Sequence, residues 1–222
     1  MKVLVCALAL LAAAPAAPPP PTAPTAPTAV KRTVQDGILR SPRDPEITLK
    51  VADGFQYLGS FPFTIAGIAG GERHVWVDAG KDRRIRRMFI LQFEGYFEGT
   101  GRRYNYTPRN VTKLGATDYN SNGFMYRDLD LFKERPGTEA EKTRTFVEEK
   151  GYTLDPEQLL YRFYRSLPED HRNEFLIFYI QPLADLGMAL KDTSENQDTE
   201  REKAIVAAAR ERALQAFTIL TP

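Results

Sequence analysis

The stretch Glu174-Phe175-Leu176-Ile177-Phe178-Tyr179-Ile180-Gln181 is an almost continuous apolar run with the length of a β-strand. A run of this kind predicts a strand that is buried on both faces, because it has no polar face to offer to water. Such a strand lies in the interior of a sheet, between other strands. The sequence is therefore expected to fold around a sheet that has residues 174–181 near its centre.

Several segments before this run also have the composition of strands. Apolar and polar residues alternate in Ile47–Val51, and aromatic and β-branched residues are frequent after it, although Pro62 indicates an edge strand or a bend. The turn-like sequence Ala79-Gly80-Lys81-Asp82 separates two alternating segments and predicts a β-hairpin. The segments expected to form strands are 47–51, 55–68, 73–78, 83–97 and 102–107.

Helix signals follow these strands. Thr138-x-x-Glu141 has the pattern of a capping box, and Gly151 stands where a glycine ends a helix. Asp155-Pro156-x-Gln158 repeats the N-terminal pattern and predicts a second helix that ends before Pro168. An apolar stripe near the C-terminus predicts a third helix. The expected helices are 138–150, 155–166 and 198–217, and residues 108–137 are expected to form a long polar loop.

Length and composition limit the class of protein. The chain has 222 residues, of which 42% are hydrophobic and 27% charged, and its formal net charge is +1. These values exclude collagen, a coiled coil, a wholly disordered chain and a polytopic membrane protein. The balanced charge disfavours a nucleic-acid partner, which usually requires a basic excess. The order of elements predicts an α+β fold, a curved antiparallel β-sheet with about three α-helices packed on one face.

The N-terminal residues differ from the rest. Lys2 precedes an apolar run of about a dozen residues, which is too short to span a bilayer and fits a secretory signal peptide at residues 1–17. Residues 18–30 are mainly proline, alanine and threonine and predict an extended, disordered spacer, after which residues 31–222 are expected to form a single domain. Cys6 is the only cysteine and lies within the signal. The mature protein is therefore expected to have no disulfide and no transmembrane span, and to be secreted or periplasmic, in a bacterial envelope.

The predicted hairpin contains the candidate binding residues. His74 and Trp76 share one face of the first strand, and Arg87 shares that face from the second strand with several apolar residues. If the turn contains two or four residues, His74 lies opposite Arg87 and Trp76 lies opposite Ile85. An imidazole and a guanidinium on an aromatic surface can orient an amphipathic or anionic ligand, although both side chains could instead have only structural contacts. The residues expected to bind a small molecule are His74, Trp76, Arg87 and Tyr104.

The same hairpin offers weaker candidates for catalysis. Acid/base chemistry requires His74 to hydrogen-bond to a carboxylate, for which Glu94 and Asp78 are the candidates. Glu94 lies in mid-strand and needs a partner such as Arg73, so a structural ion pair is the alternative interpretation. The sequence has only two histidines, no zinc-ligand spacing and no phosphate-binding glycine loop, so neither a metal nor a cofactor is expected.

Three functions remain open from the sequence. The first is an exported, non-catalytic domain that binds a small amphipathic or anionic ligand against the aromatic sheet face. The second is an acid/base enzyme, a hydrolase or an isomerase-like catalyst, that uses His74. The third is an envelope interaction module, in which the five basic residues of Lys81–Arg87 meet an anionic surface. We prefer the first, because the sequence contains no recognisable catalytic motif.

Overall fold

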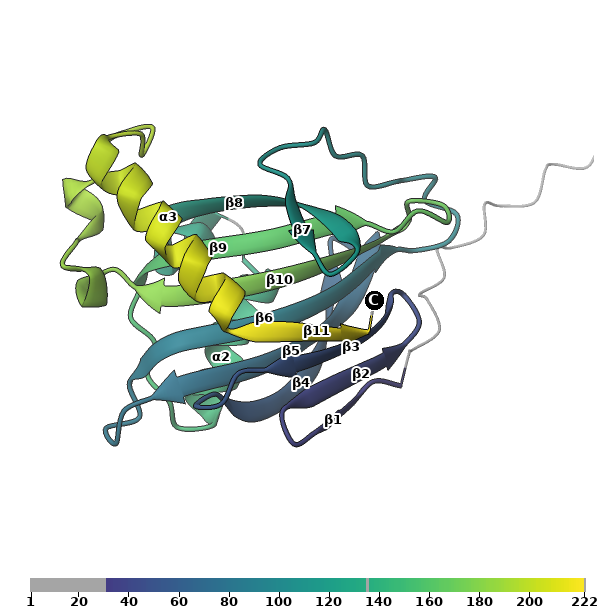
Figure 1. The fold of residues 1–222 in the computed structure, drawn as a ribbon, viewed down its shortest axis with the longest axis horizontal. Helices are drawn as coiled ribbons and strands as arrows, with labels where there is room; N and C mark the ends of the chain where they lie inside the picture. Colours follow the sequence, from purple (N-terminus) through teal and green to yellow (C-terminus); the bar gives the residue numbers. More distant parts are fainter. Residues whose placement is uncertain (1–30, 135, 222) are drawn as a thin grey trace, which may run out of the picture.

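The computed structural model describes residues 31–134 and 136–221, which form two antiparallel β-sheets and three α-helices (Figure 1). The α+β class expected from the sequence is therefore confirmed. The predicted signal peptide and spacer, with Cys6, lie outside the described residues. Among the described helices, none is both long enough and apolar enough to cross a membrane.

The larger sheet has seven strands in the order β4-β5-β6-β10-β9-β8-β7. Its middle strand, β10, contains the apolar run Glu174–Gln181, and every residue of the strand after Asn173 is buried. The prediction of a central strand buried on both faces is thus confirmed. The strands of this sheet are β4 (Gln56–Ile65), β5 (Ala69–Ala79), β6 (Ile85–Tyr96), β7 (Thr112–Leu114), β8 (Thr117–Arg127), β9 (Glu157–Ser166) and β10 (Asn173–Pro182).

Strands β5 and β6 form the predicted hairpin, and His74, Trp76 and Arg87 share one face of it as predicted. The predicted partners are wrong: His74 lies opposite Leu91 rather than Arg87, and Trp76 lies opposite Phe89. The reason is the connection between the strands, which has five residues instead of two or four and is followed by a shift of register where β5 ends.

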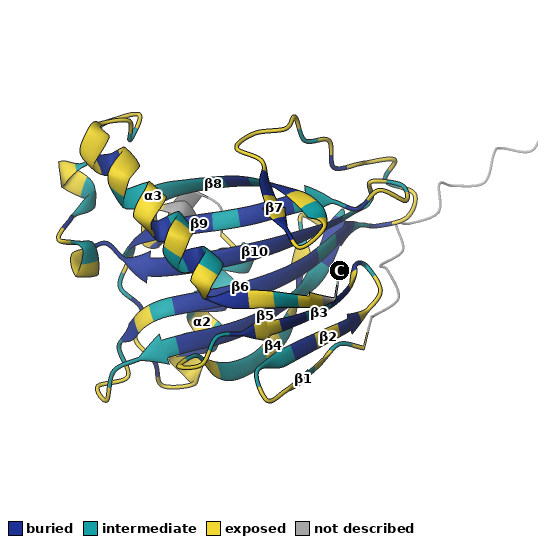
Figure 2. Cartoon of the chain, in the orientation of Figure 1, coloured by how far each residue is buried: buried dark blue, intermediate teal, exposed yellow. Residues whose placement is uncertain are grey.

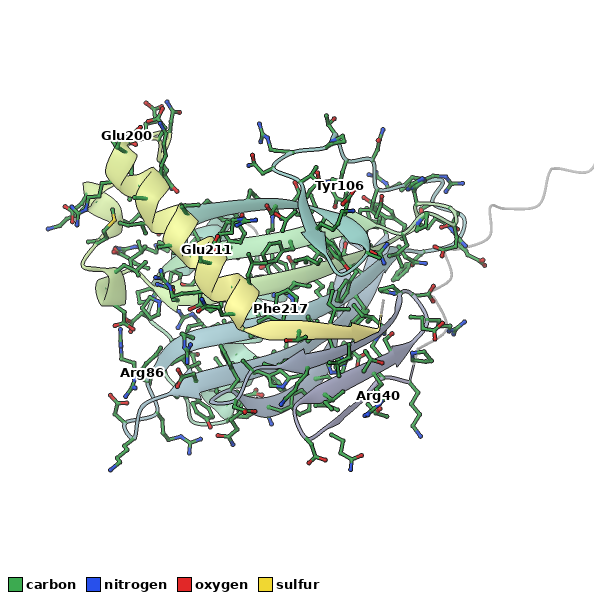
Figure 3. The ribbon with its side chains drawn as sticks, viewed as in Figure 1. Arg40, Arg86, Tyr106, Glu200, Glu211 and Phe217 are labelled. Atoms are coloured by element: carbon green, nitrogen blue, oxygen red, sulfur yellow. The ribbon has the colours of Figure 1, made fainter. Side chains whose placement is uncertain are left out.

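A smaller sheet covers one face of the larger one. Leu39 and Leu49 of the smaller sheet are fully buried in one cluster with Trp76 and Phe89 of the larger sheet, and the strands beneath this layer are largely buried in Figure 2. Phe217, labelled in Figure 3, extends this layer and lies 5.5 Å from Phe89 between ring centroids. The strands of the smaller sheet, in the order β1-β2-β3-β11, are β1 (Thr33–Gln35), β2 (Ile38–Pro42), β3 (Glu46–Val51) and β11 (Phe217–Thr221).

The helices lie on both faces of the larger sheet, which corrects the predicted single-faced arrangement. Helix α3 packs in the same layer as the smaller sheet, whereas Val147 of α2 is buried on the opposite face with Val75 and Ile90 (Figure 1). Helix α2 begins after the predicted N-cap, Thr138, and Gly151 follows its end with a φ of 78°. The helices are α1 (Asp128–Glu134), α2 (Glu139–Glu149) and α3 (Glu200–Gln215), with short 3₁₀ turns at Ala184–Leu186 and Leu190–Asp192.

The segment predicted as the second helix, 155–166, contains strand β9 instead. Leu159 and Phe163 belong to the cluster beneath α3, whereas Leu160 and Tyr164 belong to the cluster beneath α2. In a strand that is buried on both faces, apolar residues no longer alternate with polar ones. The remaining apolar residues can then have the spacing that is expected of one face of a helix. The last predicted helix is also too long, since α3 ends at Gln215 and the chain continues into β11.

Two further expectations are corrected. Residues 108–137 are not one long loop, because they contain β7, β8 and α1, and residues 102–107 do not form a strand. The polar composition of β8 has a structural reason: Tyr161 Oη donates a hydrogen bond to Ser121 Oγ at 3.0 Å, and both side chains are buried. A polar side chain with a buried partner is compatible with a sheet interior, so composition alone conceals such a strand.

The burial of β10 predicts a large loss of stability when a side chain of this strand is truncated. Ile177 is 1% exposed, and Ile177→Ala should lower the free energy of unfolding by about 2–5 kcal/mol, because the missing atoms leave a cavity. Leu220→Ala is the control: its side chain is 48% exposed, and the change should be below about 0.5 kcal/mol. Urea denaturation measures both values, and equal losses would contradict the central position of β10.

Candidate functional site

A cavity of about 300 Å³ lies between the larger sheet and helices α1 and α2. It is on the face opposite α3 and the smaller sheet. Strands β6, β9 and β10 form its floor, and α2 contributes Ala140 and Thr143 to the opposite wall. This volume is at the lower end of the range for small-molecule sites, about 300–1,000 Å³.

The cavity floor changes from polar to apolar along the strands. Strands β6 and β10 are antiparallel neighbours, and four of their cross-strand pairs line the cavity. In order along the strands, the pairs are Glu94–Glu174, Gln92–Leu176, Ile90–Phe178 and Met88–Ile180. The first and last pairs are separated by about 20 Å, from the rise of a strand per residue. The floor is therefore an amphipathic surface with two charged residues at one end.

Two glutamates face each other at this polar end. Glu94 and Glu174 are directly opposite on β6 and β10, and Glu174 is 5% exposed. Tyr104 Oη donates a hydrogen bond to Glu94 Oε1 at 2.6 Å, and Tyr106 Oη donates one to Glu174 Oε2. The two tyrosine rings are nearly parallel, with 25° between their planes and 6.3 Å between centroids. The segment after β6, in which Figure 3 labels Tyr106, thus fixes both carboxyls in position.

Burial sets the protonation of this pair. Desolvation is the main reason that the pKa of Glu174 is raised to about 8; the charge of Glu94 adds to the rise, and the Tyr106 hydrogen bond opposes it. The pKa of Glu94 is also raised, mainly by desolvation. Burial and the adjacent carboxylates raise the pKa values of Tyr104 and Tyr106, so both hydroxyls remain donors. At neutral pH the glutamate pair therefore holds a proton.

Neither carboxyl forms an ion pair with any of the described residues, although two arginines also line the cavity. Arg162 is engaged elsewhere: its Nε donates to Asn122 Oδ1 at 2.8 Å, and its guanidinium lies 4.7 Å from the ring centroid of Tyr164. Buried carboxylates normally require a cationic partner, because removing a charge from water is costly. Arg73 and Arg162 therefore act on the two carboxyls only through their charge, without a direct ion pair.

Arg73, the second arginine, holds α2 over the cavity. Its buried side chain donates from Nη1 to Thr143 Oγ1 at 2.7 Å and to the backbone carbonyl of Glu139 at 3.0 Å. Its Nε donates to Gln92 Oε1 at 2.5 Å, and Gln92 Nε2 in turn donates to Glu94 Oε2 at 2.6 Å. Arg73 was one candidate for the ion-pair partner of Glu94, but its hydrogen bonds reach that carboxyl only through the Gln92 amide.

His74 and Trp76, which were expected to bind a ligand, lie on the other face of the sheet. They are 2% and 0% exposed beneath the smaller sheet. His74 Nδ1 lies 2.9 Å from Tyr57 Oη, and His74 Nε2 lies 3.3 Å from Glu72 Oε1. A ligand could reach these side chains only if the smaller sheet moved away. Their role in ligand binding stays a prediction, and their present contacts are structural.

Arg87 and Asp78 pair with each other at the end of the hairpin. Arg87 Nε and Nη2 donate to Asp78 Oδ2 at 2.8 and 2.6 Å. The structure does not bring His74 together with either carboxylate expected to assist it, because Asp78 is engaged by Arg87 and Glu94 lies on the opposite face of the sheet. An acid/base site built on His74 with these carboxylates has no geometric support.

Tyr104 and Glu94 are sequence-predicted residues that the structure brings together, and Glu94 lines the cavity. Glu174 was not expected there, although the sequence contains a signal for it: it is the only charged residue in the apolar run 174–181. A charge in a strand buried on both faces needs a specific environment. The pairing of Glu174 with Glu94 has no local signal, because it depends on the register between strands that are far apart in the chain.

No protein-family model matches the chain, and comparisons with curated proteins and with solved structures give no match. The candidate site is therefore identified by its geometry and its charges, without support from a relative.

The raised pKa of Glu174 predicts that stability falls as the pH rises. The carboxyl keeps its proton to about pH 8 in the folded protein but loses it near the ordinary value of 4.5 in the unfolded chain. The unfolded chain thus binds fewer protons in this interval, so the free energy of unfolding should decrease as the pH rises from about 4.5 to about 8. Glu174→Gln should remove this part of the decrease, on the order of 3 kcal/mol.

Urea denaturation at about pH 5 and about pH 9 measures this dependence. Glu195→Gln changes an exposed glutamate and should leave the pH dependence of the wild-type protein intact. The same dependence in Glu174→Gln and in the wild-type protein would contradict the assignment.

Proposed function

We propose that this chain is an exported, non-catalytic domain that binds a small amphipathic molecule in the cavity beneath α2. The observation that carries this proposal is the polar-to-apolar gradient along β6 and β10. An apolar body would lie against Ile90, Phe178 and Ile180, and a polar group would lie at Glu94 and Glu174. Burial of the body supplies affinity, and the polar end supplies orientation.

The walls of the cavity are already held in position by contacts within the protein. Arg144 of α2 donates from Nε to Asp128 Oδ2 at 2.8 Å, which ties α2 to the start of α1. On the neighbouring strands, Tyr126 Oη donates to Gln158 Oε1 at 2.8 Å. A site whose groups are ordered before binding loses less conformational entropy when a ligand enters. This arrangement supports binding of a ligand rather than incomplete packing.

The export part of the proposal rests on the sequence of residues 1–30, with the predicted signal and spacer, and favours a periplasmic or secreted location. The envelope-interaction alternative receives less support. Arg84 Nη2 lies 2.5 Å from Asp155 Oδ2 and 2.9 Å from Asp185 Oδ1, so its charge is neutralised within the protein. Arg83 Nε donates to the carbonyl of Gly151, and Arg87 pairs with an aspartate as described above.

A second candidate function is acid/base catalysis in the same cavity. One arrangement favours it: Glu174 and Glu94 lie opposite each other, and burial raises the pKa of Glu174 to about 8, so one carboxyl holds a proton at neutral pH while its neighbour can accept one. His74, expected from the sequence in this role, lies on the covered face. A catalyst converts its ligand, whereas a binding protein releases it unchanged, so mass spectrometry of the ligand after incubation separates the two functions.

Filling the cavity should weaken binding without unfolding the protein. Ala140 lines the cavity from α2, and Ala140→Phe introduces a ring into it. The wild-type protein should bind 1-octanol, a neutral amphipathic probe, and the variant should lose at least about tenfold in affinity because the space for the alkyl chain is filled. Isothermal titration calorimetry measures both affinities.

The matched control for this experiment is Ala207→Phe, at an exposed position of α3 on the other face of the sheet, which should bind the probe like the wild-type protein. Wild-type protein that does not bind the probe, or binding that survives in Ala140→Phe, would contradict the proposed site. Native mass spectrometry of protein purified from its natural host then identifies a retained ligand.

The signal peptide should be removed when the chain is exported. Production of the full chain in a bacterium that has a periplasm should yield a periplasmic protein whose mass corresponds to cleavage near residue 17, because small residues follow the apolar run there. A chain that lacks residues 2–17 should remain in the cytoplasm. An uncleaved chain found in the cytoplasm would overturn the export part of the proposal.

A further inference from the structure

The polar end of the cavity has two carboxyls, and none of the described residues forms an ion pair with either, which constrains the chemistry of a ligand. We propose that the polar group of the ligand is a primary ammonium, which is held between Glu94 and Glu174. The inference rests on the proposed binding function and names the class of ligand, a primary amine with an apolar body.

Hydrogen-bond acceptors exceed donors at this end. Each oxygen of Glu94 accepts one hydrogen bond, from Tyr104 and from Gln92, both at 2.6 Å. Glu174 Oε2 accepts one from Tyr106, and none of the described residues donates to Glu174 Oε1. A carboxylate oxygen can accept about two hydrogen bonds, so both side chains keep free acceptor positions. A primary ammonium offers three donors together with a positive charge, and can bridge the two carboxylates.

Two positively charged side chains lie near the pair, and each makes its direct contacts with other groups, so both act on the pair only through their charge. Arg73 Nη2 lies 3.6 Å from Glu139 Oε1, in addition to its hydrogen bonds to α2, and Arg162 is held by Asn122 and an aromatic ring. The groups that influence the pair are Arg73 of β5, Tyr104 and Tyr106 after β6, Arg162 of β9 and Glu139 of α2.

This distribution of charge discriminates between head groups. A ligand carboxylate would bring a further negative charge to the glutamate pair, which disfavours the anionic ligand that the sequence also allowed. A neutral hydroxyl would leave the proton of the pair in place. An ammonium would replace that proton and supply a direct ion pair, which none of the described residues forms with either carboxyl. The apolar body would then extend along Leu176 and Phe178, away from the charged end.

Three probes that share an alkyl chain test this inference: octylammonium, 1-octanol and octanoate. Isothermal titration calorimetry at about pH 7 should show octylammonium binding at least about tenfold more tightly than 1-octanol, because charge-assisted hydrogen bonds are stronger than neutral ones. Octanoate should bind most weakly. Titrations in two buffers of different ionisation enthalpy should show that octylammonium, but not 1-octanol, releases about one proton from the glutamate pair.

Two variants keep the shape of the site and remove one charge each. Glu174→Gln and Glu94→Gln should each reduce the preference for octylammonium over 1-octanol to less than about threefold, because each removes a carboxylate that can pair with the ammonium. Glu195→Gln, an exposed position outside the cavity, should keep the wild-type preference. Thermal unfolding of each variant verifies that it is folded. If one variant does not fold, the other still tests the inference.

The outcomes separate this inference from the proposed function. If 1-octanol binds but octylammonium binds no more tightly, the ammonium inference fails and the binding proposal stands. If the preference for octylammonium persists in both glutamine variants, the glutamate pair does not hold the head group and the inference fails. If none of the probes binds to the wild-type protein, the inference and the proposed function fail together.

Discussion

Every residue of strand β10 after Asn173 is buried, so both faces of the seven-stranded sheet must be covered. The two covering layers differ. On one face, α3 and the smaller sheet form an aromatic layer around Trp76, Phe89 and Phe217. On the other face, α2 covers the sheet less completely, and the cavity lies beneath it. The candidate site is thus a consequence of how the second face of β10 is covered.

The polar groups of the cavity have two different roles. Arg73 attaches α2 to the sheet through Thr143 and Gln92, and so holds α2 in place above the strands that form the cavity floor. Glu94 and Glu174 place carboxyls where apolar side chains would pack more favourably. Their pKa values are raised because burial disfavours the charged form. Perturbed carboxyls that face a cavity are typical of sites that bind or transform a ligand.

Local sequence signals were reliable where the structure depends on local interactions. The Thr138 cap, the β5–β6 hairpin and the burial of β10 all have short-range causes, and each was expected. The signals were misleading in β9, which is buried on both faces and therefore lacks the alternation of apolar and polar residues that marks a strand. Its apolar residues have the spacing expected of a helix. The binding face was misplaced for a related reason: the aromatic surface with His74 and Trp76 suits a ligand, but a second sheet covers it.

The sequence by itself determined that this protein has a central buried strand, that His74, Trp76 and Arg87 share a sheet face, and where α2 begins. These properties follow from side-chain alternation, hydrophobicity and capping, all of which act over a few residues. Only the tertiary structure decided that Glu94 lies opposite Glu174 and that both line a cavity rather than the surface. The register between distant strands, and the layer that covers each face, depend on the packing of the whole chain, and no short stretch of sequence contains that information.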